Sequence, residues 1–341
     1  MKLFGKEVDK DYIRKHFNNM DAVADARESV LTGGKSEGVR TIDVKTGSGL
    51  RFSVLPTRGM DVVCAEYQGI PLSYLSKTGV VHPAYFEKDG LNFLRGFFCG
   101  LITTCGLTYM GPPCNDEGTE LGLHGRISNT PAESCSVDKS WNGNDYEITV
   151  QGKARESSVF GENMTLTRKI TTSLGSSSLK VHDVIENEGF KEQPLMVLYH
   201  CNFGYPIVSP DSHITISEPY TVKARDEEGE VDKCLVMEEP RTGYNEQVFM
   251  HTVDPSRGSC TVKIFNEALK LGVYVKYNPL QLPYMSEWKV MDCDEYVVGI
   301  EPSTWTVFGR EEARKRNELL FLKPGEKKEI DLELGVIDER R

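Results

Sequence analysis

Three short segments carry polar side chains at the ends of apolar stretches, where a purely structural β-protein would not need them. LGLHGRISNTPA contains His124, LYHCNFGYP contains His200 and Asn202, and YVVGIEPST contains Glu301. A carboxylate that follows the apolar run VVGI is costly to bury alone, so Glu301 must be paired, exposed or functional. A histidine and a carboxylate that share a pocket can transfer protons near neutral pH. These segments therefore predict acid/base chemistry at His200 and Glu301.

Each of these residues also has a structural interpretation. His200 could be a core histidine bonded to a backbone carbonyl, and Glu301 could be a strand-end partner in a salt bridge. His124 could be a turn residue held between two glycines. The sequence has no GxSxG nucleophile elbow and no P-loop, which disfavours nucleophilic and phosphoryl-transfer enzymes. Periodicity alone does not show that the three residues meet.

The elements that must position these residues are short β-strands. From Val39 onward, apolar and polar residues alternate, and turns rich in Gly, Asn, Ser and Asp separate the alternating stretches. Without regular strand–helix alternation or a blade-length repeat, this pattern predicts an all-β sandwich or barrel. Residues 91–131 and 226–255 break the pattern, and long loops in an all-β frame commonly carry sites. REEARKRNEL, after Gly309, predicts a short surface helix.

The first 38 residues are predicted to form a helical or extended segment that packs on a main domain of residues 39–341. Asp9 or Asp11 could cap a helix in this segment. A second amphipathic stretch is expected over residues 22–26.

Composition limits the partners and the compartment. The formal net charge of −11 over 341 residues argues against nucleic acid and anionic membranes as partners. No secretory signal or membrane span is evident. The nine cysteines are scattered without a CxxC pair, which predicts reduced thiols and a cytoplasmic protein. Cys105, Cys114 and His124 could be imagined as zinc ligands, but their spacing is irregular, and we expect no metal.

Together, the segments resemble the galactose mutarotase-like superfamily and are most similar to its less characterised aldose 1-epimerase-like branch. LGLHGRISNTPA resembles the LHG motif of that superfamily, LYHCNFGYP its second histidine motif, and YVVGIEPST the strand that delivers its catalytic glutamate. The strands leading into LYHCNFGYP and the closing strand FLKPGEKKEIDLELGV are also similar. The resemblance covers residues 41–336, and the order histidine, histidine, glutamate is that of the family.

The resemblance implies a large antiparallel β-supersandwich and an isomerase of the aldose 1-epimerase type, which interconverts the anomers of a free sugar or sugar derivative. Carried over by position, His200 would protonate the ring oxygen, Glu301 would take the proton of the anomeric hydroxyl, and His124 would bind the sugar near the ring oxygen. Arg95 falls near the place of a family arginine that binds hydroxyls, and Asn202 is expected in the binding site. The expected partner is a small carbohydrate, and mutarotation requires no metal or organic cofactor.

The chain also departs from the better-known galactose mutarotases. GLHGR stands where they have a glycine pair after the histidine, so Arg126 could enter the site. The stretches VLPTRGMDV and LPYMSEWKV add Arg58, Glu287 and Trp288 as candidate pocket residues. An arginine would favour an acidic or phosphorylated sugar, whereas an aromatic ring would favour stacking on a sugar face. Arg58 could instead form an ion pair with Asp61, and Trp288 could be an ordinary core aromatic.

Two other functions remain open at this point. A non-catalytic carbohydrate-binding protein on the same fold would not need Glu301. A sugar hydrolase or lyase is a further alternative, since Glu287 and Glu301 could supply the two carboxylates that a hydrolase requires. The sequence does not identify the sugar, the preferred anomer or whether the protein is a monomer or a homodimer.

Overall fold

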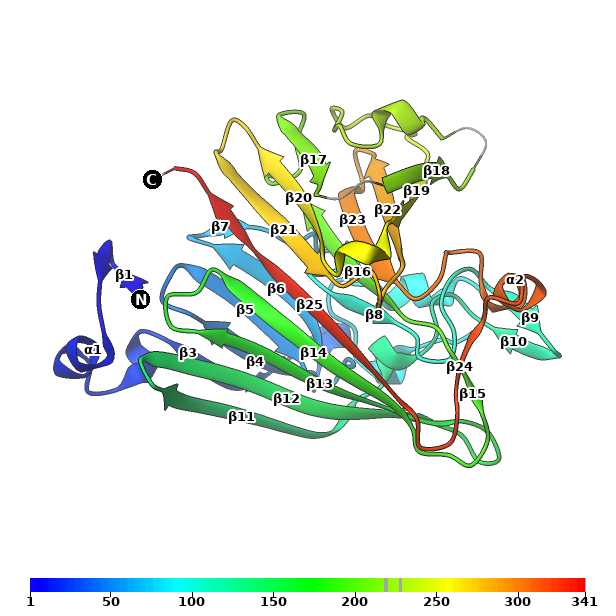
Figure 1. Ribbon diagram of the computed structural model, residues 1–341, viewed down its shortest axis with the longest axis horizontal. Coiled ribbons are helices and arrows are strands. Elements are labelled where there is room, and N and C mark those ends of the chain that lie inside the picture. The colour runs from blue at the N-terminus through cyan, green and yellow to red at the C-terminus, as the bar shows by residue number, and fades with distance from the viewer. Residues whose placement is uncertain (218–219, 227–228, 341) are drawn as a thin grey trace.

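The computed structural model describes residues 1–217, 220–226 and 229–340, which fold largely into antiparallel β-strands (Figure 1). One layer is an eight-stranded sheet. Its strands, in spatial order, are β11 (Ala132–Asn142), β12 (Asp145–Ser157), β13 (Asn163–Ser173), β14 (Ser178–Asn187), β25 (Lys327–Asp338), β21 (Leu271–Tyr277), β20 (Cys260–Asn266) and β17 (Ser212–Ile216).

The second layer combines two sheets, which isolated bridges such as Val62 to Ile102 and Ser73 to Phe203 connect. The six-stranded sheet has the order β18 (Tyr220–Ala224), β19 (Gln247–Val253), β22 (Tyr284–Met291), β23 (Tyr296–Ser303), β16 (Leu198–Gly204) and β8 (Thr103–Cys105). The five-stranded sheet has the order β3 (Asp25–Val30), β4 (Arg40–Lys45), β5 (Leu50–Leu55), β6 (Asp61–Tyr67) and β7 (Ile70–Pro71).

Short elements complete the chain. The two-stranded sheets are β1 (Lys2–Leu3) with β2 (Lys6–Glu7), β9 (Cys114–Asp116) with β10 (Thr119–Leu121), and β15 (Gln193–Leu195) with β24 (Leu320–Leu322). The α-helices of the described residues are α1 (Lys10–His16) and α2 (Arg310–Lys315). The 3-10 helices are Met20–Ala22, Gly34–Ser36, Pro83–Tyr85, Asn92–Gly96, Ile127–Asn129, Val231–Lys233 and Pro255–Arg257. The predicted all-β sandwich is confirmed.

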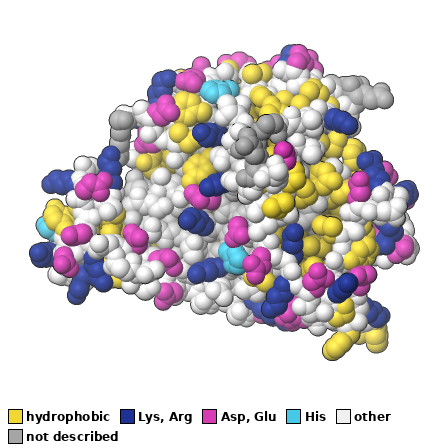
Figure 2. All heavy atoms as spheres, viewed as in Figure 1, with side chains coloured by type: hydrophobic (Ala, Val, Ile, Leu, Met, Phe, Trp, Pro, Cys, Tyr) yellow, Lys and Arg dark blue, Asp and Glu magenta, His cyan; other side chains and the backbone are white. Residues whose placement is uncertain are grey.

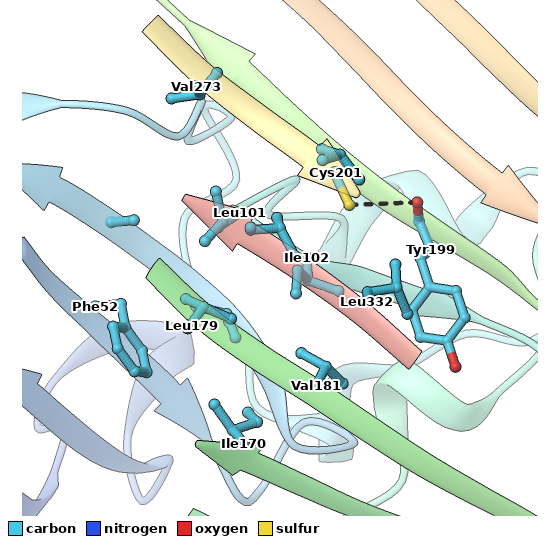
Figure 3. Packing of buried hydrophobic residues seen from close by; sticks show 14 of the residues in the cluster. Phe52, Leu101, Ile102, Ile170, Leu179, Val181, Tyr199, Cys201, Val273 and Leu332 are labelled. Atoms are coloured by element: carbon cyan, nitrogen blue, oxygen red, sulfur yellow. Dashed lines mark hydrogen bonds between the residues drawn. The ribbon is translucent and has the colours of Figure 1, made fainter. Parts of the chain in front are cut away.

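The main core lies between the two layers. Strands such as β12 and β14 alternate buried and more exposed residues, as expected of strands with one face on a core. Figure 3 shows Ile170 and Val181 of the eight-stranded sheet in the same buried cluster as Ile102 and Cys201 of the second layer. By contrast, β16 is buried along its whole length, because loop residues also cover the outer face of the six-stranded sheet. That cover is what encloses the side chains of the candidate site.

The expected helices were correct in part. Asp9 caps α1, because its Oδ1 accepts the Tyr12 N–H at 2.8 Å. The stretch 22–26 was predicted wrongly: the 3-10 helix ends at Ala22, and β3 begins at Asp25. β3 pairs with β4 in the five-stranded sheet, so part of the N-terminal segment contributes directly to the sandwich.

The helix predicted after Gly309 is present as α2, but it is not only a surface element. The Arg310 side chain is buried, and its Nε donates to Asp116 Oδ2 at 2.7 Å. On the visible face of the molecule, charged side chains of both signs are mixed with apolar ones (Figure 2). None of the helices in the described part of the chain has both the length and the apolar character needed to cross a membrane.

A buried ion network ties the two layers together behind β16. Arg168 donates to both carboxylate oxygens of Asp183, at 2.9 and 2.6 Å, and to Asp61 Oδ1 at 3.1 Å. The Tyr199 hydroxyl donates to Asp183 Oδ2 at 2.7 Å. Since Tyr199 precedes His200, this network fixes the backbone that carries the histidine.

Candidate active site

His200 and Glu301 lie side by side on the neighbouring strands β16 and β23. Their closest atoms, His200 Nε2 and Glu301 Oε1, are 3.1 Å apart, and the two residues are only 4% and 3% exposed. Glu301 Oε1 has no hydrogen-bond partner among the described residues, so its contact with His200 Nε2 is not aligned as a hydrogen bond. His200 Nδ1 is also buried without a partner among these residues. The two side chains therefore lie within reach of each other and have donor and acceptor atoms that no other described residue occupies.

Burial sets the charge state of this pair. Burial lowers the pKa of His200 well below its usual range, and the nearby His124 ring adds to the shift. Burial also raises the pKa of Glu301 well above its usual range, with a further contribution from the Glu246 carboxylate, whereas Arg225 opposes the shift. The two directions together favour a neutral imidazole beside a protonated carboxyl. The pair thus holds one transferable proton.

Gly299 provides the space in which the His200 and Glu301 side chains contact each other. A Cβ atom at this position would lie 2.7 Å from Glu301 Oε1 and 3.1 Å from His200 Cε1. Any side chain at residue 299 would push the carboxylate away from the histidine. An isolated glycine inside a strand pattern is a sequence signal for such a close approach, and it was not used to predict this site.

His124 faces the same pair from a loop. Its ring centroid is 5.9 Å from that of His200 and 5.5 Å from that of Phe93. Burial lowers the pKa of His124 to about 4, so the ring is neutral near pH 7. The Gly111 N–H donates to Nδ1 at 3.4 Å, which leaves Nε2 to carry the ring proton. His124 can therefore donate one hydrogen bond from Nε2 toward a ligand oxygen.

The glycines around His124 explain the GLHG pattern. His124 itself has a left-handed backbone, with φ of 59°. A Cβ at Gly122 would lie 1.8 Å from the Lys88 carbonyl oxygen, and one at Gly125 would lie 2.5 Å from the Gly106 carbonyl oxygen. The loop can turn the histidine inward only because residues 122 and 125 lack side chains.

Aromatic rings enclose His200. The Phe97 and Trp288 rings lie edge-on to it, with centroids at 5.0 and 5.2 Å. The Trp288 Nε1–H donates to Glu246 Oε2 at 3.0 Å, and Glu246 Oε1 accepts from Arg225 at 2.9 Å. Trp288 therefore lies beside His200 and connects it to Glu246. Phe97, Glu246 and Arg225 were not identified from the sequence, because only long-range folding brings their loops to these strands.

Asn202 braces β16 next to the pair. It is fully buried, and its Nδ2 donates to the Gly100 carbonyl at 3.2 Å and to the His200 carbonyl at 2.9 Å. Its Oδ1 has no partner among the described residues. The hydrogen bonds of Asn202 Nδ2 are thus with the backbone, and the Asn202 side chain also interacts with the His200 ring, where it opposes the lowering of the pKa of His200.

Arg58 lies in a structural position. It is fully buried, and its guanidinium donates to the carbonyls of Val81, Gly96 and Ser128 at 2.7–3.1 Å. No ion pair with Asp61 occurs among the described residues, because Asp61 pairs with Arg168. Since Gly96 precedes Phe97, Arg58 holds one aromatic wall of the site in place.

The other two candidate arginines lie in more open positions. Arg95 is exposed in the 3-10 helix Asn92–Gly96, and its Nε donates to Asn92 at 3.3 Å. Arg126 is partly exposed, and its Nη1 lies 3.6 Å from Glu162. The structure records no contact of either arginine with His200 or Glu301.

Glu287 lies on the opposite face of the six-stranded sheet from Glu301. The strand register pairs Glu287 with Ile300, whereas Glu301 pairs with Ser286. Glu287 is fully buried, and its Oε2 lies 3.0 Å from His251 Nε2. This geometry separates the two carboxylates that a hydrolase on this site would have used.

Residues 36–336 match the family model described as "Domain of unknown function (DUF4432)", and the chain belongs to this family. No curated protein matches the sequence.

Several solved structures share the fold. A protein from Klebsiella pneumoniae subsp. pneumoniae, described as a "putative aldose 1-epimerase", is 26% identical with a TM-score of 0.86 over 97% of this chain and 87% of that one. A galactose mutarotase-like protein from Clostridium acetobutylicum is 16% identical, with a TM-score of 0.64 over 93% and 99% of the two chains. Galactose 1-epimerase from Lactobacillus acidophilus is 11% identical, with a TM-score of 0.58 over 92% and 98%. The fold is therefore mutarotase-like.

Proposed function

We propose that this member of the DUF4432 family is an isomerase of the aldose 1-epimerase type, which interconverts the anomers of a small carbohydrate by acid/base ring opening. The observation that carries the proposal is the buried contact of 3.1 Å between His200 Nε2 and Glu301 Oε1, with His124 facing it. Two unpartnered titratable groups at one point are costly to maintain for structure alone. The similarity to a protein described as a "putative aldose 1-epimerase" supports the same reaction.

The proposed reaction needs the charged form of the pair, with carboxylate on Glu301 and imidazolium on His200. The carboxylate takes the proton of the anomeric hydroxyl, the bond from the anomeric carbon to the ring oxygen breaks, and His200 gives its proton to the ring oxygen. The open-chain aldehyde turns about its first carbon–carbon bond. Ring closure on the other face returns both protons, so the enzyme ends in its starting state.

The surrounding residues support substrate binding in this scheme. The neutral His124 would donate from Nε2 to an oxygen of the sugar near the ring oxygen. Trp288 and Phe97 would pack against the apolar face of the sugar ring. A cavity of about 440 Å³ adjoins this cluster through Glu246, which lines it and bonds to Trp288. Arg95 and Arg126 remain candidates for binding outer hydroxyl groups.

Anomer exchange measured by NMR over a panel of free and phosphorylated sugars tests the proposal. Glu301→Gln keeps the size and polarity of the side chain but cannot accept a proton, so we expect kcat to fall by roughly 10²- to 10⁴-fold with sugar affinity near wild type. His200→Asn should behave similarly. Glu329→Gln, in the other layer, is the matched control and should keep full activity.

Two outcomes would contradict the proposal. Full activity in Glu301→Gln would remove the carboxylate from the chemistry. Tight sugar binding by the wild type, without acceleration of exchange for any sugar that binds, would instead identify a non-catalytic carbohydrate-binding protein.

A further inference from the structure

A second buried cluster of reactive side chains lies on the inner face of the six-stranded sheet, away from the His200–Glu301 pair. His251 on β19 and Glu287 on β22 point to this face, and Cys234 approaches it from the loop after the 3-10 helix Val231–Lys233. The Cys234 sulfur, one His251 ring nitrogen and one Glu287 carboxylate oxygen all lie within 4.8 Å of one another. The active-site chemistry proposed above does not use these residues.

The hydrogen bonds of this cluster are incomplete. His251 and Glu287 are fully buried, and Cys234 is 3% exposed. His251 Nε2 contacts Glu287 Oε2 at 3.0 Å, but His251 Nδ1 and Glu287 Oε1 have no partner among the described residues. Buried polar atoms without partners are rare in folded proteins and call for a ligand or an ion.

We propose that Cys234, His251 and Glu287 bind one zinc-like divalent transition-metal ion. Sulfur, imidazole nitrogen and carboxylate oxygen are all established zinc ligands, and a thiolate with a carboxylate supplies two negative charges to balance the ion. Bond lengths of about 2.0–2.3 Å place tetrahedral zinc ligands about 3.3–3.8 Å apart. Small side-chain movements of about 1 Å would bring the observed atoms to that spacing.

Lys289 is the charged group nearest in sequence to Glu287 on the same strand face. Its Nζ donates to the carbonyl oxygens of Lys233, at 2.9 Å, and of Val236. The ammonium is therefore directed at the loop that carries Cys234, and no ion pair joins it to Glu287 among the described residues. Lys289 therefore holds the loop that carries Cys234, and its charge also acts on Glu287 and Cys234.

The ion would clamp a loop to the sheet. Cys234 belongs to the segment between β18 and β19, whose residues Glu230 and Glu246 line the cavity of about 440 Å³. The ligand spacing, with residues 234, 251 and 287 on three separate elements, is not a sequence motif for zinc, which is why the folded structure is needed to find the site. The proposal does not depend on the epimerase reaction.

The test uses the full-length protein after removal of metal with a chelator. Zn²⁺ is titrated in competition with a chromophoric zinc chelator, and we expect one equivalent to bind per chain. Cys234→Ser, His251→Gln and Glu287→Gln should each weaken binding by about 100-fold or more. Cys64→Ser, which removes an exposed thiol on β6, is the matched control and should bind Zn²⁺ like the wild type.

A second measurement does not depend on the variants folding. Co²⁺ added to the metal-free wild type should give the near-ultraviolet charge-transfer absorption of a thiolate–cobalt bond, and Zn²⁺ should abolish it. Absence of this band, or Zn²⁺ binding that is unchanged in all three ligand variants, would overturn the proposal. Anomer-exchange activity measured in parallel would show whether the ion also affects the sugar site.

Discussion

Two buried groups of ionisable side chains lie on opposite sides of β16, and burial affects them differently. On the inner face, the carboxylates of Asp183 and Asp61 outweigh the effect of burial on Arg168 and hold its pKa above the usual value. On the outer face, burial shifts the pKa values of His200 and Glu301 in opposite directions, toward the neutral forms. The first group places Arg168 and Asp183 in well-formed contacts that join the two layers, although Asp61 Oδ2 has no partner among the described residues and burial raises the pKa of Asp61 to about 6. The second group leaves Glu301 Oε1 and His200 Nδ1 without hydrogen-bond partners among the described residues, which is the property expected of a site that performs proton transfer.

The largest expected effect is a difference in how much the Arg168 group and the His200–Glu301 pair contribute to the stability of the fold. Arg168→Met leaves two buried carboxylates without their partner, so we expect the free energy of unfolding to fall by about 3–5 kcal/mol. Glu301→Gln replaces a carboxyl that is already largely protonated, so its change should stay within about 1 kcal/mol. Denaturant unfolding of both variants measures the difference. Equal losses of stability would show that the His200–Glu301 pair is also a structural ion pair.

The next effect concerns the geometry of the pair. Gly299→Ala should displace the Glu301 carboxylate, since the new Cβ would lie 2.7 Å from Oε1, and the anomer-exchange rate should fall by roughly 10²-fold. Gly272→Ala, on β21, is the contrasting variant because its Cβ would lie 2.6 Å from the Ile264 carbonyl oxygen. That change should lower stability and leave the rate constant of the folded enzyme unchanged. A Gly299→Ala variant with full activity would show that the contact of the pair is not required.

The alternation of apolar and polar residues was sufficient to predict an all-β sandwich or barrel, because strands such as β12 and β14 bury one face against the main core, and the family resemblance implied the sandwich. The alternation was not sufficient for the site. Glu287 and Trp288 are adjacent in sequence and were both predicted to line the pocket, but successive residues of a strand point to opposite faces. Only Trp288 lies beside His200. The sequence shows that two neighbours diverge, but not which of them faces the site.

The role of Arg58 illustrates a second limit of sequence reasoning. A buried arginine is expected to face a carboxylate or an anionic ligand, and both were considered for it. Its guanidinium instead binds backbone carbonyls of Val81, Gly96 and Ser128, which come from three separate loops. Backbone acceptors leave no signal in side-chain types. His124, His200 and Glu301 were predicted because they lie at the ends of apolar stretches and because their motifs resemble a family, and not because their spacing shows contact.

The pH dependence of kcat/KM tests how the proton is shared. The active form carries one proton in total, so the rate should be bell-shaped. Because the pKa of His200 is lowered and that of Glu301 is raised, the acidic limb reports uptake of a second proton by His200, and the basic limb reports loss of the proton from Glu301. The residual activity of Glu301→Gln still needs the imidazolium of His200, so the acidic limb should disappear and the rate should fall above the lowered pKa of His200, near the position of the wild-type acidic limb. A fall at the position of the wild-type basic limb instead would mean that Glu301 titrates below His200.

The smallest expected effect tests the same assignment of the basic limb to Glu301. Glu246 is exposed, accepts a hydrogen bond from Trp288, and helps to raise the pKa of Glu301. Glu246→Gln can keep the bond to Trp288 but removes the charge, so the pKa of Glu301 should fall and the basic limb should move to lower pH. The charged form of the pair, which is the minor form, then becomes more populated. We expect the plateau of kcat/KM to rise by about 1.5- to 5-fold while rates at high pH stay the same, with a smaller effect at high salt.

This outcome distinguishes two orders of titration. If Glu301 were already ionised and His200 already protonated on the plateau, the same substitution would move only the acidic limb and leave the plateau unchanged. Glu186→Gln, on β14, is the matched control, because its carboxylate lies in the other layer and pairs with Lys327 at 3.2 Å. It should alter neither limb. A plateau that rises in Glu246→Gln but not in Glu186→Gln would show that burial limits the reaction rate, because it holds both His200 and Glu301 in their neutral forms.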